Sequence, residues 1–273
     1  MFRFKSRKSK NNLEQEMSFL DHLEAFRWHL VRSLCVVGIL MIVVFNYLDQ
    51  VIAEVVLAPF RPNFPVNAWL CMVNKDLCFE KIDVVFQATE PYEQFTRAFF
   101  LAFMGGLVVG SPYILWEVWR FVKPGLRSSE KSLARWAFWS VFILFNTGFV
   151  FGYFVITPFS VRFLSSFKLA PEVQNIWRIG DVISLITEIS IAGGILFELP
   201  FVSYILSRLG ILTPAFMRKY RRHAIVIILI VAGILTPPDP LSQILLGVPM
   251  WGLYEVSILI SAYVQRKKLV KQR

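Results

Sequence analysis

The chain has 273 residues, of which 56% are hydrophobic and only 18% charged, and its formal net charge is +10. Soluble domains carry about 25% charged residues, whereas several apolar runs here reach the roughly 20 residues that cross a bilayer. The composition therefore excludes a soluble domain and predicts an all-α membrane protein with several spans.

Six transmembrane helices are expected, within a single domain over residues 18–268. Basic tails flank this domain at residues 1–17 and 269–273. The expected spans are residues 28–47, 95–116, 136–156, 182–206, 223–236 and 242–264.

Lys and Arg counts predict the orientation of these spans, because cytoplasmic segments carry an excess of them. Of 29 such residues, 22 lie in the two terminal segments and the two loops that share their side, and six lie in the alternate loops. Both termini are therefore expected in the cytoplasm. The basic clusters lie beside spans, which favours contact with the anionic inner leaflet of the lipid bilayer over nucleic-acid binding.

The entry to the first span, FLDHLEAFRWHL, mixes charged and aromatic residues over positions 19–30. Ser18 and Asp21 fit a capping box, which predicts that a helix begins at Ser18. Phe19, Phe26 and Leu30 then fall on one apolar stripe at helical spacing, together with Leu23. Such a stripe favours packing or interface anchoring unless further evidence indicates a binding site.

The first outer loop, residues 48–94, contains Cys71 and Cys78. On the outer side of the membrane these two cysteines would meet an oxidising compartment, where a disulfide is expected. The alternative is two free thiols.

Carboxylates within the spans are costly, by at least about 2.5–3.5 kcal/mol at the bilayer centre. Glu188 lies near one end of the fourth span, which favours an interfacial position. Glu198 lies deeper, in LFELP, where Pro200 frees a backbone carbonyl, and this favours a functional role. Glu255, in the sixth span, fits function and charge neutralisation of a partner helix equally well.

The last two spans are unusual. The fifth has only about 14 apolar residues, which rise about 21 Å, and this is shorter than the bilayer core. The sixth is interrupted by Gly247-Val248-Pro249. We expect no enzymatic activity, cofactor or metal, because the sequence lacks a GxSxG, HExxH or P-loop motif and cysteines at ligand spacing from histidines.

Several motifs together resemble the twin-arginine translocase TatC family. HLEAFRWHL is similar to the family's HLxELRxR entry segment, and SPYILWEVWRFVKPGLRSSEK is similar to its second-span exit and first cytoplasmic loop. FELP, ILTPPDPLSQ and PMWGLYE follow in the family's order and spacing, so the resemblance covers residues 19–268.

The resemblance implies a TatC-like concave bundle of six helices, both termini in the cytoplasm, and two short final helices. It implies a signal-peptide receptor and channel-forming component of Sec-independent protein export, powered by the proton-motive force. The implied partners are TatA/TatB-type single-span proteins, twin-arginine signal peptides of folded cargo, and further copies of the chain in a larger complex.

The resemblance also implies the site residues. Glu130 matches a signal-binding glutamate, and Phe121 and Leu126 match apolar positions beside it that could receive the signal's hydrophobic part. Carboxylates suit this task, because the guanidinium group forms forked, bidentate bonds to them that lysine cannot copy.

One expected carboxylate is missing, because Ala25 stands where the family has the Glu of ELR. Three alternatives follow. Glu24 or Asp21 replaces it by a small helix rotation, Glu130 acts alone, or recognition is weakened. Arg27 matches the family's Arg and could instead pair with Glu24 at i+3.

The resemblance gives the remaining polar residues their roles. Glu198 matches a buried fourth-span Glu and is expected to be a polar docking point for a partner helix or an inserted signal. The outer hairpin between the last two helices is expected at Thr236, Pro237, Pro238, Asp239 and Gln243. Two alternatives remain: a proton-coupled secondary transporter that uses Glu188, Glu198 and Glu255, and a scaffold that recruits partner helices.

Overall fold

The computed structural model describes residues 19–73, 82, 84–122, 131–168, 170, 175–235 and 240–272, and these are mostly helical. The α-helices are α1 (Phe19–Asn46), α2 (Leu48–Val51), α3 (Pro65–Val73), α4 (Glu93–Val122), α5 (Lys131–Phe151), α6 (Thr157–Ser166), α7 (Ile179–Leu196), α8 (Leu199–Leu209), α9 (Pro214–Lys219), α10 (Arg221–Leu235) and α11 (Pro240–Gln272). The π-helices η1 (Ile52–Val56) and η6 (Gly152–Ile156), the 3-10 helix η2 (Ala58–Phe60) and the strands β1 (Val85–Gln87) and β2 (Ile176–Arg178) complete the described elements.

Five helical stretches of the described chain are long and apolar enough to cross a membrane, and they correspond to five of the six predicted spans. They are Glu24–Asn46, Glu93–Phe121, Phe138–Ser166, Ile179–Leu209 and Gln243–Lys268. The predicted fifth span is α10, whose 15 residues rise about 22 Å. The helix exists and is short, as the sequence indicates.

The sixth helix differs from the prediction. α11 runs for 33 residues through Pro249 without interruption, so it is neither short nor broken. Proline in a membrane helix is tolerated where neighbouring helices and local adjustments satisfy the freed backbone groups. α11 packs against α8, α9 and α10, which supports it along its length.

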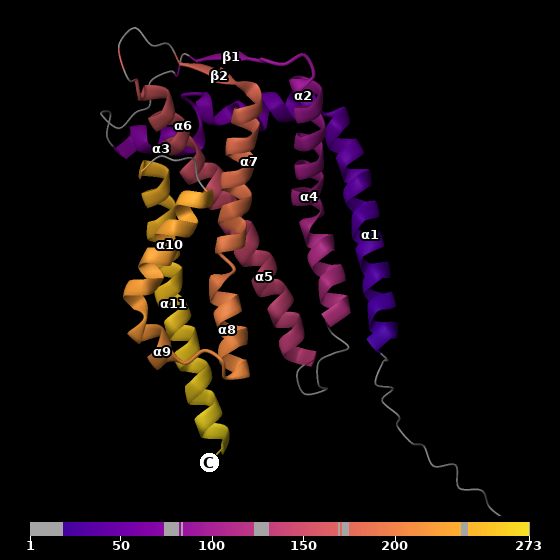
Figure 1. Ribbon diagram of the computed structural model, residues 1–273, viewed down its shortest axis with the longest axis vertical. Coiled ribbons are helices and arrows are strands. Elements are labelled where there is room, and N and C mark those ends of the chain that lie inside the picture. Colours follow the sequence, from indigo (N-terminus) through magenta and orange to yellow (C-terminus); the bar gives the residue numbers. More distant parts are fainter. Residues whose placement is uncertain are drawn as a thin grey trace, which may run out of the picture.

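The arrangement places the N-terminal end of α1 and the C-terminal end of α11 at the same end of the molecule (Figure 1). α2, α3 and the strands lie at the opposite end, which we call the outer end. α1 and α4 form an antiparallel pair along one side, and α10 and α11 lie on the other. A shared side for the start of α1 and the end of α11 agrees with the charge pattern of the sequence.

Glycines allow the long helices to approach closely. A Cβ atom built at Gly106 of α4 would lie 2.9 Å from the carbonyl oxygen of Val37 in α1, and one at Gly110 would lie 3.2 Å from Leu40. On α5 and α7, a Cβ atom at Gly193 would lie 2.5 Å from the carbonyl oxygen of Gly148. Small residues at helix crossings are typical of membrane proteins, where packing replaces the hydrophobic effect between helices.

A two-stranded sheet of β1 and β2 lies at the outer end. β1 and β2 pair in parallel, with Val85 opposite Ile176. Glu93, at the start of α4, is buried. Its Oε2 accepts the backbone N–H of Thr89 at 2.8 Å, and its Oε1 lies 3.6 Å from Nε of Arg178 in β2. The outer loop is thereby attached to the long helices.

The fourth predicted span consists of two helices, because α7 ends at Leu196 and α8 begins at Leu199. Pro200 stands in the first turn of α8, where its missing N–H costs nothing. Glu198 occupies the N-cap position of α8. The break therefore places a carboxylate in the middle of the helical bundle.

Candidate functional site

The first candidate site lies at the start of α1 and the end of α4, opposite the outer end. The rings of Phe26 in α1 and Phe121 in α4 lie 5.1 Å apart between centroids. Glu24 and Arg27 of α1 are exposed. Among the described residues the two form no ion pair with each other, so the i+3 pairing considered from the sequence is wrong. The start of α1 therefore carries an exposed carboxylate, Glu24, two residues before the ring that packs against α4.

Other predicted members of this site are not described. Glu130 and Leu126 lie outside the described residues, and of Asp21 only the helical backbone is described. Their roles therefore stay predictions.

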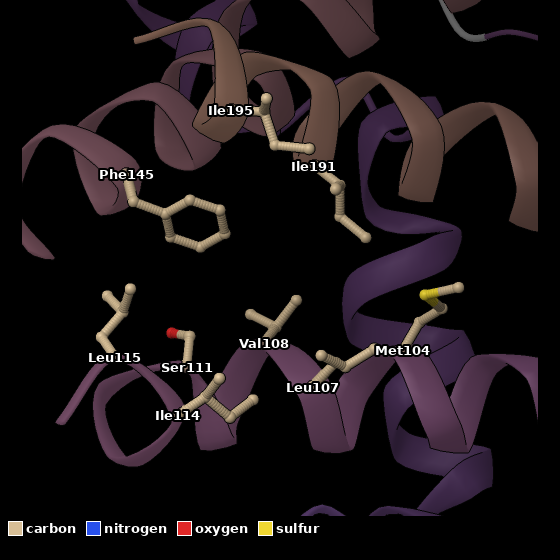
Figure 2. Close-up of a pocket in the computed structure, with 9 residues that line it drawn as sticks. All are labelled: Met104, Leu107, Val108, Ser111, Ile114, Leu115, Phe145, Ile191 and Ile195. Carbon is tan, nitrogen blue, oxygen red and sulfur yellow. The ribbon is translucent and has the colours of Figure 1, made fainter. Parts of the chain in front are cut away.

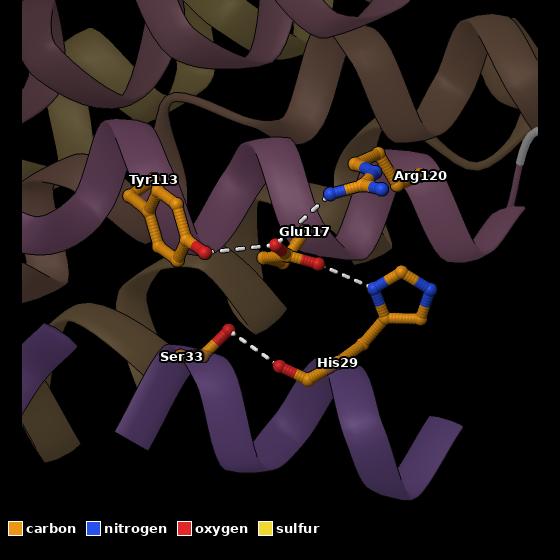
Figure 3. Close-up of polar contacts among 5 residues, drawn as sticks. All are labelled: His29, Ser33, Tyr113, Glu117 and Arg120. Atoms are coloured by element: carbon orange, nitrogen blue, oxygen red, sulfur yellow. Dashed lines mark hydrogen bonds and ion pairs between the residues drawn. The ribbon is translucent and has the colours of Figure 1, made fainter. Parts of the chain in front are cut away.

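Glu117 is a site residue that the sequence did not predict. Its side chain is only 1% exposed. Oε2 pairs with Nδ1 of His29 in α1, and Oε1 accepts a hydrogen bond from the hydroxyl of Tyr113 at 2.9 Å and lies 3.4 Å from Nη1 of Arg120 (Figure 3). The predicted second span ended at Trp116, so Glu117 fell in the expected loop. The spacing of Tyr113, Glu117 and Arg120, at i−4 and i+3, could have indicated a helical cluster.

The second candidate site is Glu198. Both of its carboxylate oxygens are buried, and neither has a hydrogen-bond partner in the described part of the chain. A buried polar group without a partner costs about 1–3 kcal/mol. The α7–α8 break therefore holds a costly group, and the functional role of Glu198 stays a prediction.

An apolar groove of about 380 Å³ has Phe145, whose backbone lies near this carboxylate, in its lining. Helices α4, α5 and α7 line it, with Phe145 of α5 facing Ile191 and Ile195 of α7 (Figure 2). Ser111 of α4 adds a buried hydroxyl that has no hydrogen-bond partner among the described residues. Glu198 lies near the backbone of Phe145. The groove therefore has an apolar lining that includes the unsatisfied hydroxyl of Ser111, and the unsatisfied carboxylate of Glu198 lies near the backbone of one lining residue.

Two of the remaining predicted residues, Glu255 and Gln243, have structural partners. Glu255 of α11 forms an ion pair with Arg221 of α10 at 2.6 Å, which supports charge neutralisation over a free carboxylate. Gln243 donates a hydrogen bond to the carbonyl oxygen of Leu229 at 2.9 Å, which ties α11 to α10. Thr236, Pro237, Pro238 and Asp239 lie outside the described residues.

Of the two cysteines predicted to form a disulfide, the structure describes one. Cys71, in α3 at the outer end, is disulfide-bonded, so it is not a free thiol. Cys78 lies outside the described residues. The described residues contain no group of three or more His, Cys, Asp or Glu that could hold a metal ion.

Comparisons with known proteins agree with this architecture. The family description "Sec-independent protein translocase protein (TatC)" matches residues 21–249. A TatC protein of Blattabacterium sp. subsp. Periplaneta americana is 33% identical over 264 residues, covering 94% of this chain and 99% of its own length. One from Halalkalibacterium halodurans is 32% identical over 262 residues, covering 95% of this chain and 96% of its own.

The fold is also similar to a solved structure. A crystal structure of the twin-arginine translocase receptor TatC superposes with a TM-score of 0.66 at 26% identity, covering 89% of this chain and 99% of that one. The family match spans most of the chain, and the superposition covers 89% of it. This chain therefore belongs to the TatC family of Sec-independent protein translocase components.

Proposed function

We propose that the chain is the core signal-peptide receptor and a channel-forming component of twin-arginine protein export, and that it is not an enzyme. The observation that carries the proposal is the arrangement at the ends of α1 and α4, where Phe26 packs against Phe121 and Glu24, two residues before Phe26 in α1, is exposed. A twin-arginine signal carries two guanidinium groups and an apolar segment, and this arrangement offers carboxylate and aromatic surface for both.

Recognition follows from the chemistry of arginine. A guanidinium group binds a carboxylate through two parallel hydrogen bonds, and such charge-assisted bonds are roughly twice as strong as neutral ones. Lysine offers a point charge without this fork. In our proposal Glu130 and Glu24 contact the arginine pair, with Asp21 nearby, while Phe121 and Leu126 contact the apolar segment.

The second part of the proposal concerns the membrane interior. Glu198 is the polar docking point for a partner helix or an inserted signal, which would lie along the apolar groove. The partners are single-span proteins of the TatA/TatB type, and further copies of the chain join the complex. Transport of folded cargo uses the proton-motive force, with both termini in the cytoplasm and the chain in the inner membrane.

A proton-coupled transporter is the weaker alternative. It would need a connected path of membrane carboxylates. Glu255 is already paired with Arg221, and Glu188 is exposed on α7. Neither feature favours a path through Glu198.

The test is binding of a twin-arginine signal peptide and of its twin-lysine copy to the purified chain. We expect a preference for arginine that Glu130→Gln abolishes, and Ala25→Glu to strengthen binding by adding a carboxylate. If both peptides bind equally poorly to the wild type and to both variants, the chain is not a twin-arginine receptor, and a helix-recruiting scaffold would explain it better.

A further inference from the structure

The buried carboxylate of Glu117 already binds a guanidinium group. Arg120 lies one turn further along α4 and reaches Oε1 at 3.4 Å, while its own side chain is 50% exposed. Charge-assisted N–H···O bonds are about 2.7–2.9 Å long, so this contact is long for its type. The ion pair is therefore weak, and the guanidinium group of Arg120 reaches the buried carboxylate from a half-exposed side chain.

The other two partners of Glu117 fix the carboxylate in place. His29 holds Oε2 from α1, and its own backbone carbonyl accepts a hydrogen bond from Ser33 at 3.0 Å (Figure 3). The hydroxyl of Tyr113 donates to Oε1 at 2.9 Å. A carboxylate held on both oxygens needs little reorganisation to receive a cation, which favours binding.

The position of Glu117 matches the place where the first helix lacks an acid. Ala25 precedes His29 by four residues, so the two share one face of α1, and both are partly buried there. The ring of Phe121 lies 6.1 Å from that of His29. Among the residues whose side chains the structure describes, the carboxylate at this level of the α1–α4 interface is therefore that of Glu117, on α4.

We propose that Glu117 is a further carboxylate that binds the arginine pair of the signal peptide, beside Glu130 and Glu24, with Arg120 as an internal guanidinium that leaves Oε1 when the ligand arrives. This inference rests on the proposed function and names a binding residue for it. Glu117 lies four residues before the end of the apolar stretch at Phe121, which is about 6 Å along a helix. An arginine side chain can span that depth while its backbone stays at the membrane surface.

The experiment measures the affinity of the purified full chain for twin-arginine and twin-lysine signal peptides. Glu117→Gln keeps the shape of the side chain and removes its charge. We expect the ratio of the two affinities to fall by about tenfold or more, since a hydrogen bond to a charged group contributes at least one such factor. Glu54→Gln, an exposed outer-end residue paired with Arg61, is the matched control and leaves the ratio unchanged.

Two further variants separate binding from packing. Arg120→Gln removes the internal competitor, so it should tighten twin-arginine binding several-fold while changing twin-lysine binding less. Ala25→Glu added to Glu117→Gln should restore part of the arginine preference by returning a carboxylate to the same interface. Arg120→Gln also decides the matter if Glu117→Gln does not fold, since Arg120 is half exposed.

The outcomes distinguish the inference from the proposed function. If the wild type prefers the twin-arginine peptide but Glu117→Gln lowers the affinity for both peptides equally, Glu117 only packs α1 against α4 and the inference is wrong. It is equally wrong if Arg120→Gln weakens twin-arginine binding. If the wild type itself shows no preference, the receptor function fails first.

Discussion

At the scale of single residues, the two buried carboxylates differ in how their charge is compensated. Glu117 has partners on both oxygens, whereas both oxygens of Glu198 lack one in the described part of the chain. Removing a partnered buried charge is costly, while replacing an unpartnered one with an apolar group of similar shape is neutral or stabilising. The stability of the fold therefore does not explain why a glutamate stands at position 198.

This contrast gives a prediction for Glu198→Leu. We expect the variant to be more stable than the wild type by about 1–3 kcal/mol, because an unsatisfied buried group is removed. We also expect it to lose export of a twin-arginine reporter in cells that depend on this chain. Thermal unfolding in detergent and an export assay measure the two effects. A variant that assembles with its partners and exports normally would refute the docking role.

At the scale of helices, close packing depends on glycine where α1 crosses α4. The Cβ position of Gly106 is within 2.9 Å of both the Val37 carbonyl oxygen and the Met41 nitrogen, which are backbone atoms and cannot turn away. Any larger residue there must move one helix relative to the other. Because His29 and Glu117 meet across the same pair of helices, such a shift would also disturb the candidate site.

We predict that Gly106→Leu destabilises the protein by about 1–3 kcal/mol, the usual cost of overpacking. Gly38→Leu is the control, because nothing lies within 4 Å of a Cβ atom at Gly38 of α1. Unfolding midpoints of both variants in the same detergent provide the measurement. Equal midpoints for the two variants would show that the α1–α4 crossing is looser than described.

The same scale shows what the sequence could predict. Apolar length and charge predict the long helices, whereas the sequence analysis expects one continuous fourth span and the structure divides it at Glu198. The continuity of α11 through Pro249 could not be predicted, since it depends on support from α8, α9 and α10. Glu117 could not be predicted as a site residue, because the expected second span ends at Trp116, before this first charge after the apolar run. In the structure the helix continues, since His29 of α1 compensates the charge of Glu117.

At the scale of the whole molecule, the two ends have different characters. The outer end carries the paired strands and the disulfide-bonded Cys71, and the opposite end carries Glu24, Arg27 and the ends of α1 and α11. A receptor for a signal made in the cytoplasm needs its carboxylates on the cytoplasmic side. The orientation is therefore a condition of the proposed function.

The orientation can be tested with single cysteines in a Cys35→Ser background. Asn63→Cys, exposed at the outer end, should react in intact cells with a maleimide that cannot cross the inner membrane. Gln265→Cys, exposed near the end of α11, should react only after lysis. The opposite pattern would place the candidate site on the wrong side of the membrane.

The central claim, that this chain receives the signal at the ends of α1 and α4, is tested most directly by site-specific photocrosslinking in membranes. A photoreactive residue would replace Glu24 or Phe121, with Trp69 of α3, 63% exposed at the outer end, as the control position. We predict crosslinks to a twin-arginine precursor from positions 24 and 121 that weaken with its twin-lysine copy, and none from position 69. Crosslinks that do not depend on the arginine pair, or that appear only at position 69, would contradict the account.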